Sequence, residues 1–307
     1  MNPVFFVFSV ILQIMVFQFR LIDSQSLPEF PSGSSILLAN DKLYLVGDDA
    51  NNMVILDKNY RKLDQVALFD YPAKRIPKDE KVDLEGAVLL NTKHGQQLMA
   101  FGSASEKNRQ KIVCLSITRK NKKSVIDYGV FINRLARKGI NEVNIEGATL
   151  VGDEIILVNR GNNFNRKNYL ITTSRNFWED QKSCPIQVHE LIIPSVSGNF
   201  LGVSEVHYAK AHDLLLFTFT SEETSNAYDD GVIGESYLGW ITSAKKNPKN
   251  RISELTKLSD IDANFKGQKI EGVCAERIGE NKMILHFVAD NDQGESKLFK
   301  VQMNSAN

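Results

Sequence analysis

The amino-acid sequence predicts an all-β protein, a five-bladed β-propeller whose ring is closed by pairing of the N- and C-terminal segments. Three observations predict it. A short phrase centred on glutamate recurs along the chain, alternating β-branched segments follow each copy, and the last copy lacks a fourth strand. Six blades are the alternative, but they would need a further unit that the sequence does not show.

The repeated phrase reads Asp-Leu-Glu-Gly-Ala at residues 83–87, Asn-Ile-Glu-Gly-Ala at 144–148 and Lys-Ile-Glu-Gly-Val at 269–273. A fourth copy, Val-Ser-Glu-Val-His at 203–207, keeps the glutamate and loses the glycine. Ser-Ser-Ile-Leu-Leu at 34–38 stands at the same place in a fifth unit. The spacings are 61, 59 and 66 residues between the successive glutamates Glu85, Glu146, Glu205 and Glu271.

Each phrase opens a first strand, and three more strands are expected in each unit. Second strands that end in small or polar residues are predicted at 42–49, 98–105, 155–162, 215–223 and 284–292. Third strands are predicted at 53–59, 111–117, 168–173, 237–242 and 297–303. Fourth strands are predicted at 62–70, 124–132, 185–193 and 252–261. The alternating and β-branched character of these segments favours strands over helices, and four strands per repeat are typical of a propeller blade.

The two ends of the chain are expected to share the last blade. The final repeat ends at Met303, directly after its third strand, and residues 19–27 resemble the fourth strands of the other units. Pairing these segments would remove two exposed sheet edges, which otherwise invite aggregation. The sequence therefore predicts one propeller domain over residues 18–307.

Residues 1–17 are expected to lie outside this domain, because the segment from Pro3 to Phe19 is apolar and contains no charge. One interpretation is an export or anchor signal, and the other is an apolar leader that takes no part in the fold. The first would place the protein outside the cytoplasm, exported or periplasmic, and the second inside it. Contact with a membrane is expected only through this segment.

The balance of 37 basic and 37 acidic residues argues against nucleic acid or an anionic membrane as the main partner, and leaves a small molecule or another protein. The three cysteines, Cys114, Cys184 and Cys274, have no spacing that suggests zinc or a disulfide framework. Cys114 and Cys274 lie in apolar segments and are expected in the core.

The repeat predicts a polar face near the axis, where the start of each first strand meets the end of the second. This face is expected to gather the four glutamates Glu85, Glu146, Glu205 and Glu271. From the ends of the second strands it is expected to gather Asp48, Ser103, Arg160, Asn162, Glu222 and Asp290.

The four glutamates have two interpretations. Each carboxylate could accept hydrogen bonds from the neighbouring blade and serve assembly alone. Alternatively, they hold a cation, because carboxylates about 7 Å apart repel by roughly 2–3 kcal/mol per pair at an effective dielectric near 20. Arg160 is one internal cation, and oxygen ligands without cysteine or clustered histidine favour Ca²⁺ or Mg²⁺ over zinc.

A catalytic group is harder to identify from the sequence. His207 follows Glu205 by two residues, so strand alternation places both on one side, either as a general base beside a carboxylate or as a packed core histidine. The sequence shows no nucleophile motif. Binding of a small ligand, ion or protein partner is therefore the first functional hypothesis. A divalent-metal-dependent hydrolase of lactones or phosphate esters is the alternative.

The Glu-Gly phrases, with LYLVGDD, VNRGN and DDGVIGESYLGWI, make residues 20–305 resemble an uncharacterised bacterial family of β-propellers that carries a domain-of-unknown-function label. More distantly, the phrase at residues 83–86 is similar to esterase-like phytase domains and gluconolactonase-type propellers. That distant resemblance implies a role in binding a divalent metal for Glu85, since only residues 83–86 match the full phrase.

Overall fold

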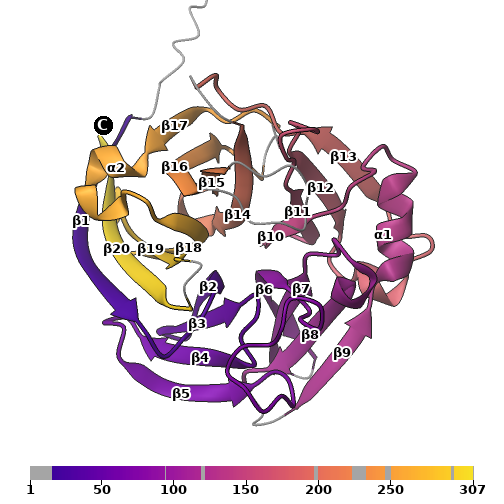
Figure 1. The fold of residues 1–307 in the computed structure, drawn as a ribbon. Coiled ribbons are helices and arrows are strands. Elements are labelled where there is room, and N and C mark those ends of the chain that lie inside the picture. The colour runs from indigo at the N-terminus through magenta and orange to yellow at the C-terminus, as the bar shows by residue number, and fades with distance from the viewer. Residues whose placement is uncertain are drawn as a thin grey trace, which may run out of the picture.

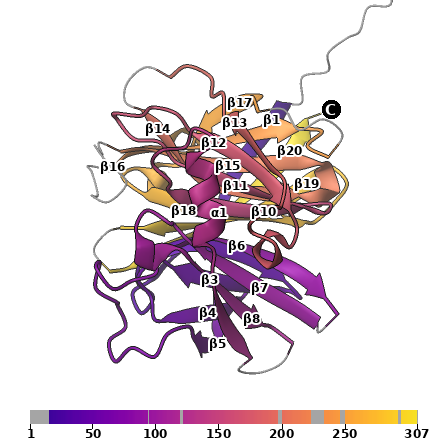
Figure 2. The same cartoon turned by 90° about the vertical axis from the view of Figure 1, so that its right-hand side faces the viewer.

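The computed structural model describes residues 16–93, 95–118, 122–196, 200–222, 233–245, 250–291 and 294–306. They form five four-stranded antiparallel sheets around one axis, as Figure 1 shows in the view down that axis. The prediction of a five-bladed propeller is confirmed. Turned by 90°, the same ring is seen edge-on in Figure 2.

The first four blades each use four consecutive strands. Blade 1 contains β2 (Gly33–Ala39), β3 (Lys42–Gly47), β4 (Asn52–Asp57) and β5 (Lys62–Ala67). Blade 2 contains β6 (Leu84–Thr92), β7 (Gly95–Gly102), β8 (Lys111–Ser116) and β9 (Lys123–Asp127). Blade 3 contains β10 (Ile145–Val151), β11 (Glu154–Asn159), β12 (Tyr169–Ser174) and β13 (Ile186–Glu190). Blade 4 contains β14 (Leu201–Ala209), β15 (Leu214–Glu222), β16 (Ile233–Thr242) and β17 (Glu254–Lys257).

Blade 5 confirms the predicted closure of the ring, because its outer strand comes from the other end of the chain. It contains β18 (Lys269–Arg277), β19 (Lys282–Asp290), β20 (Ser296–Ala306) and β1 (Val16–Leu27), and β1 pairs antiparallel with β20. The strand begins at Val16, two residues before the predicted domain boundary. Phe17 belongs to the blade, since its ring packs edge-on against Trp240 with centroids 5.1 Å apart. Residues 1–15 of the predicted leader lie outside the described residues.

Two predicted fourth strands are wrong over their second halves, where helices follow. α1 (Gly129–Ala136) comes after β9, and α2 (Leu258–Ile261) comes after β17. α1 buries Phe131, Ile132 and Leu135 between blades 2 and 3. Spacings of three and four residues place these side chains on one helix face. Short 3₁₀ helices span Lys107–Arg109, Phe177–Glu179, Lys210–His212 and Ala263–Phe265. No helix in the described part of the chain is long and apolar enough to cross a membrane.

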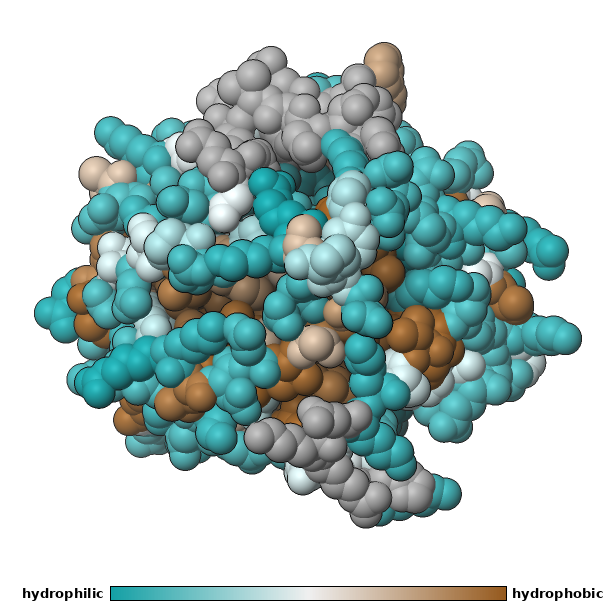
Figure 3. Space-filling model, turned by 60° about the horizontal axis from the view of Figure 1, so that its bottom comes forward, coloured by the Kyte–Doolittle hydropathy of each residue, from teal (hydrophilic) through white to brown (hydrophobic). Residues whose placement is uncertain are grey.

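The hydrophobic core is divided into five clusters, and each cluster lies between two neighbouring blades. Cys114, Cys184 and Cys274 are buried and unpaired in these interfaces or beside them, as predicted for Cys114 and Cys274. The outer surface is mostly hydrophilic, with separate apolar groups between the polar ones in the view of Figure 3. Exposed apolar side chains include Leu63 on β5 and Val125 on β9.

The first strands form the innermost ring, and each has a β-bulge close to its start. The bulge leaves one residue of the first strand without a partner on the second. The five unpaired residues are Ser34, Glu85, Glu146, Ser204 and Glu271. The repeated phrase is therefore a bulge that turns one side chain per blade to a common place at one end of the axis.

Candidate functional site

Three glutamates from three blades meet at this end of the axis. Glu85, Glu146 and Glu271 each bring one carboxylate oxygen to within 4.8 Å of the other two. We call these three residues the axial cluster. Ser34 and Ser204 hold the equivalent places in blades 1 and 4. Their shorter side chains instead donate to carbonyl groups of the following blades, Leu84 O and Ile270 O (2.7 Å for Ser204).

The residue two positions before each glutamate sets its electrostatic surroundings. Asn144 Nδ2 donates to Glu146 Oε1 at 2.6 Å, and Lys269 Nζ lies 3.1 Å from Glu271 Oε1. The residue two positions before Glu85 is Asp83, which is itself an anion and cannot donate a hydrogen bond to Glu85. As a result, the structure shows no hydrogen bond or ion pair to the Glu85 carboxylate within the described ranges.

Asp83 is instead held by two cations, Lys81 from the connection between blades 1 and 2 and Arg109 from blade 2. Lys81 Nζ lies 2.7 Å from Asp83 Oδ1, and Arg109 Nη1 lies 2.6 Å from Asp83 Oδ2. Ser103 Oγ also donates to this carboxylate. Burial alone would raise the pKa of Asp83, but Lys81 and Arg109 outweigh it and hold the pKa below its usual value. Asp83 is therefore ionised beside Glu85 at neutral pH.

Burial and mutual repulsion keep protons on the axial cluster. Burial raises the pKa of Glu85 well above its usual value, and the charges of Asp83 and Glu146 raise it further. Burial raises the pKa of Glu146 to about 8, with Arg160 opposing the shift and Glu271 adding to it. Without a compensating charge the three carboxylates are not all ionised at neutral pH, since ionising one raises the cost of ionising the next.

The structure places Arg160 beside one member of the cluster, where the sequence expected an internal cation. Arg160 Nη1 lies 3.6 Å from Glu146 Oε2, and both side chains are almost fully buried. The guanidinium also packs closely on blade 4, because a Cβ built on Gly202 would lie 2.4 Å from Arg160 Nε. Arg160 is therefore fixed against Glu146 by the neighbouring blade.

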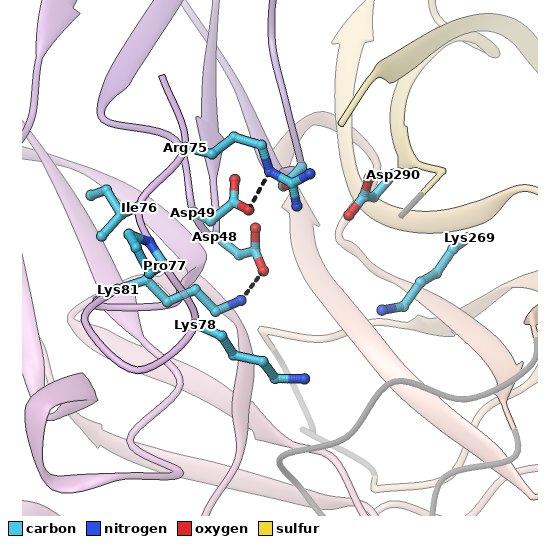
Figure 4. A pocket seen from close by; sticks show the side chains of 10 residues that line it. Asp48, Asp49, Arg75, Ile76, Pro77, Lys78, Lys81, Lys269 and Asp290 are labelled. Carbon is cyan, nitrogen blue, oxygen red and sulfur yellow. Dashed lines mark hydrogen bonds and ion pairs between the residues drawn. The ribbon is translucent and has the colours of Figure 1, made fainter. Parts of the chain in front are cut away.

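A pocket of about 280 Å³ lies beside the axial cluster, between blades 1 and 5. Its walls carry seven charged side chains, most of them visible in Figure 4. The carboxylates are Asp48, Asp49 and Asp290, and the cations are Arg75, Lys78, Lys81 and Lys269.

Asp48 connects this pocket to the axial cluster. Its carboxylate pairs with Lys81, and one oxygen each from Asp48, Asp83 and Glu85 lie within 4.8 Å of one another. Burial raises the pKa of Asp48 to about 6, with Asp83 and Asp49 adding to the shift and Lys81 opposing it. Asp48 and Asp290, which the sequence predicts on the polar face, both line this pocket.

Glu205 is not a fourth member of the axial cluster. The prediction that equated it with the other three glutamates is wrong by one residue in blade 4. The bulge residue there is Ser204, and Glu205 corresponds to the glycine of the other phrases. Its side chain crosses the axis. Oε2 accepts from Ser35 of blade 1 at 2.7 Å, and Oε1 accepts from Ala148 N of blade 3 at 3.2 Å. Glu205 therefore accepts hydrogen bonds from other blades, which is the role that the assembly interpretation assigns to the glutamates.

The repeated glycines provide the space for this arrangement. A Cβ built on Gly147 would lie 2.5 Å from Glu205 Oε1, and one on Gly86 would lie 2.7 Å from Ala148 N. Real Cβ atoms do not approach neighbours this closely. Glycine therefore recurs in the phrase because neighbouring blades touch at that point, and not because of a ligand.

His207 lies two residues after Glu205 on β14, farther from the axial cluster. Within the described residues no hydrogen bond joins it to Glu205, whose oxygens are bonded to Ser35 and to backbone amides. Burial lowers the pKa of His207 to about 4. The ring is therefore neutral at physiological pH, and its predicted partnership with Glu205 is not formed.

The remaining predicted residues are Ser103, Asn162 and Glu222. Ser103 Oγ donates to the Asp83 carboxylate, as described above. Asn162 organises the β11–β12 loop, because its Oδ1 accepts from Phe164 N and Asn165 N while its Nδ2 donates to Glu142. Glu222 ends β15, and its side chain lies outside the described residues, as do residues 223–232 of the segment that follows.

Sequence reasoning missed the cations that surround the carboxylates. Arg75, Lys78 and Lys81 lie in the connection between blades 1 and 2, which has no counterpart in the repeat. Lys269 could have been found, because it stands two residues before a glutamate, at the place where Asn144 and Asp83 stand in other copies.

A model of a family of unknown function, DUF6929, matches residues 29–303. The chain belongs to this family. The predicted membership of an uncharacterised propeller family is thus confirmed. None of the functionally characterised proteins compared with this DUF6929 chain matches it in sequence.

Solved structures share the fold of the DUF6929 chain at very low sequence identity. Glutaminyl cyclase from Myxococcus xanthus is 8% identical with a TM-score of 0.55, over 94% of this chain and 97% of the cyclase. The tail fibre of Staphylococcus aureus phage P68 is 9% identical with a TM-score of 0.51, over 94% of this chain and 53% of the fibre. Arabinanase from Bacillus subtilis is 10% identical with a TM-score of 0.45, over 92% and 96%. The likenesses to the cyclase and the tail fibre concern the fold alone, and the match to the arabinanase carries no argument.

Proposed function

We propose that the protein binds a divalent cation, Ca²⁺ in the first place, at Glu85, Glu146 and Glu271. The observation that carries this proposal is the meeting of three carboxylate oxygens within 4.8 Å at the axis. One of these residues, Glu85, has no hydrogen bond or ion pair within the described residues. Each glutamate stands on a β-bulge of a different blade, so the rigid ring brings the oxygens together before any ion arrives.

The geometry and charge of the cluster suit calcium. Ca²⁺ binds oxygen at 2.3–2.6 Å, so two ligand oxygens on opposite sides of the ion lie up to about 5 Å apart. Mg²⁺ binds at about 2.1 Å and requires oxygens closer than about 4.2 Å. A doubly charged ion would also replace the protons that the cluster retains. Binding is therefore expected to release protons and to strengthen as pH rises.

The cations already present do not prevent this binding. Arg160 and Lys269 each neutralise one glutamate from the side, and a carboxylate offers about four acceptor positions on its two oxygens. Asp83 adds negative charge next to Glu85, the member without a cation of its own. Once the ion has displaced the retained protons, the three carboxylates exceed Arg160 and Lys269 by one negative charge.

Calcium titration of the purified protein tests the proposal, by calorimetry and by thermal unfolding in calcium and in chelator. Saturation at about 100 times the dissociation constant stabilises a protein by about 2.7 kcal/mol. Glu85→Gln keeps the size of the side chain and removes one charge, so it is expected to abolish most of this gain. Glu154→Gln, on the exposed start of β11, is the matched control and should retain it.

The assembly interpretation predicts a different outcome for the same variant. If the glutamates serve assembly alone, Glu85→Gln relieves repulsion and leaves the unfolding free energy unchanged or raised. Wild-type unfolding that is indifferent to calcium and to chelator would overturn the proposal. The metal-dependent hydrolase suggested by the sequence depends on the same ion, so this titration also decides whether that alternative can be pursued.

A further inference from the structure

The pocket between blades 1 and 5 has a chemistry distinct from that of the axial cluster beside it. Its walls hold four cations and three carboxylates, whereas the cluster consists of carboxylates. A volume of about 280 Å³ lies at the small end of ligand pockets, so its occupant is a small molecule or one polar group of a larger one.

Cationic groups from two blades converge on this space. Lys78 comes from the connection that follows blade 1, and Lys269 from the start of β18 in blade 5. Their ammonium groups point toward one another across the pocket in Figure 4, and the guanidinium of Arg75 lies on a third side. The side chain of Lys269 is only 14% exposed, so its charge is held in place by the protein.

Two carboxylates of the pocket each pair with one of its cations. Asp48 pairs with Lys81, and Asp49 accepts from Arg75 Nε at 2.7 Å. Arginine has five N–H donors and lysine has three, so these pairs use only part of the donor capacity of the wall. Further donors can therefore face a ligand, whereas Asp48 Oδ1 and Asp49 Oδ1 are buried without a hydrogen-bond partner among the described residues.

We propose that this pocket binds the anionic group of a small ligand, a carboxylate or a phosphate, between Arg75, Lys78 and Lys269. Arginine suits both groups because its planar donors match two oxygens at once, and lysine adds a point charge. The site is assembled from two blades that the closure of the ring holds side by side.

The anion site adjoins the axial cluster, so the two are expected to be coupled. Lys269 contacts Glu271 at 3.1 Å, and Asp48 lies in the group with Asp83 and Glu85. Ca²⁺ takes six to eight oxygen ligands, so three glutamates leave positions for an oxygen of the ligand. This coupling rests on the proposed function, whereas the anion site itself does not.

Titration with three small probes of similar shape tests the proposal: methylphosphonate, acetate and the neutral acetamide. Binding is followed by the amide NMR signals of the full-length protein at constant ionic strength, first in chelator and then in calcium. We expect saturable shifts of Ser32, Lys78 and Asp290 with at least one anion and none with acetamide. The anion that binds more tightly shows whether the site prefers a carboxylate or a phosphate group.

Lys78→Ala is expected to weaken anion binding about tenfold, the usual effect of losing one charge-assisted hydrogen bond. Lys74→Ala is the matched control, because it removes the same charge from the same connection at an exposed side chain outside this pocket. Lys78→Gln keeps most of the side-chain stem and should weaken binding as Lys78→Ala does, which separates loss of charge from loss of packing.

Two results would overturn the anion site: no saturable binding of either anion in chelator, or equal weakening by Lys78→Ala and Lys74→Ala. Calcium is expected to raise anion affinity several-fold. Anion affinity that stays the same while calcium binds would overturn the coupling. Anion binding in a protein that does not bind calcium would overturn the proposed function and leave the anion site standing.

Discussion

At the scale of single residues, the side chain two positions before each axial glutamate differs from blade to blade. Asn144 and Lys269 donate to their glutamates, whereas Asp83 repels Glu85. The protein compensates the charge of Asp83 with Lys81 and Arg109, and leaves Glu85 without a counterpart. A pattern that repeats in sequence thus supports three different electrostatic environments in space.

The Arg160→Ala variant is expected to lose more stability at about pH 8 than at about pH 5. Arg160 lowers the pKa of Glu146, which burial nevertheless raises to about 8. At low pH Glu146 is protonated with or without Arg160, so little electrostatic stabilisation is lost. Near pH 8 the ionised form depends on the guanidinium. Chemical denaturation at both pH values measures the difference, and equal losses would contradict it.

The Gly147→Ala variant is expected to lose about 1–3 kcal/mol of unfolding free energy, because its Cβ would overlap the carboxylate of Glu205. Gly279→Ala is the control, since its nearest neighbour would lie at an ordinary 3.6 Å. Urea unfolding of the two variants measures both effects. Similar stabilities for both would mean that the blades do not pack this closely at the axis.

At the scale of elements, the sequence allowed the strands to be predicted but not the details of their register. Alternation and β-branched residues located all five blades, because the inner strands of each blade bury side chains against a neighbouring blade. The β-bulge is invisible in such patterns, so Glu205 was aligned with the wrong position of the other phrases. Residues 128–132 were predicted as strand because a short apolar run does not distinguish a buried strand from a short helix.

The candidate site was predictable to a similar extent. Glu85, Glu146, Glu271 and Arg160 could be placed together because the repeat fixes their positions relative to the axis. The pocket cations Arg75 and Lys78 lie in the connection between blades 1 and 2, whose path follows from packing and not from any repeat. A sequence without an internal comparison for that connection carries no signal of what its side chains face.

Removal of residues 1–15 is expected to leave thermal unfolding unchanged, whereas removal of residues 1–30 is expected to prevent stable folding. The longer deletion removes all of β1, exposes the edge of β20 and uncovers Trp240, on which Phe17 and Phe19 pack. Each buried aromatic side chain contributes about 1.5–3 kcal/mol. Melting and size-exclusion chromatography of both truncations test this, and equal melting temperatures would contradict the role of β1.

At the scale of the whole molecule, the axial cluster links stability to pH. Glu146, with a pKa of about 8, and Glu85 hold protons in the folded state that they lose in the unfolded chain at neutral pH. The folded state therefore binds more protons than the unfolded state, and its stability falls as pH rises. The buried histidines His207 and His286, with pKa values of about 4, act in the opposite direction only below about pH 6.5.

In chelator, the unfolding free energy is therefore expected to fall between about pH 6.5 and about pH 8, by up to about 1.4 kcal/mol per pH unit for each carboxyl that keeps its proton. Saturating calcium is expected to flatten this slope, because it displaces those protons and the folded state then binds no more of them than the unfolded chain. Denaturation across this range, with and without calcium, measures both slopes. A flat profile in chelator would contradict the protonated cluster.

The closure of blade 5 has a consequence for synthesis on the ribosome. Phe17 pairs with Ser305, so the strand made among the first waits for a partner made among the last. At about 5–20 residues per second this delay is roughly 15–60 s. During that time β1 has no sheet to join, and blade 5 cannot form. Nascent chains that stop early therefore present this strand unpaired to chaperones and to one another, whereas completed chains pair it with β20.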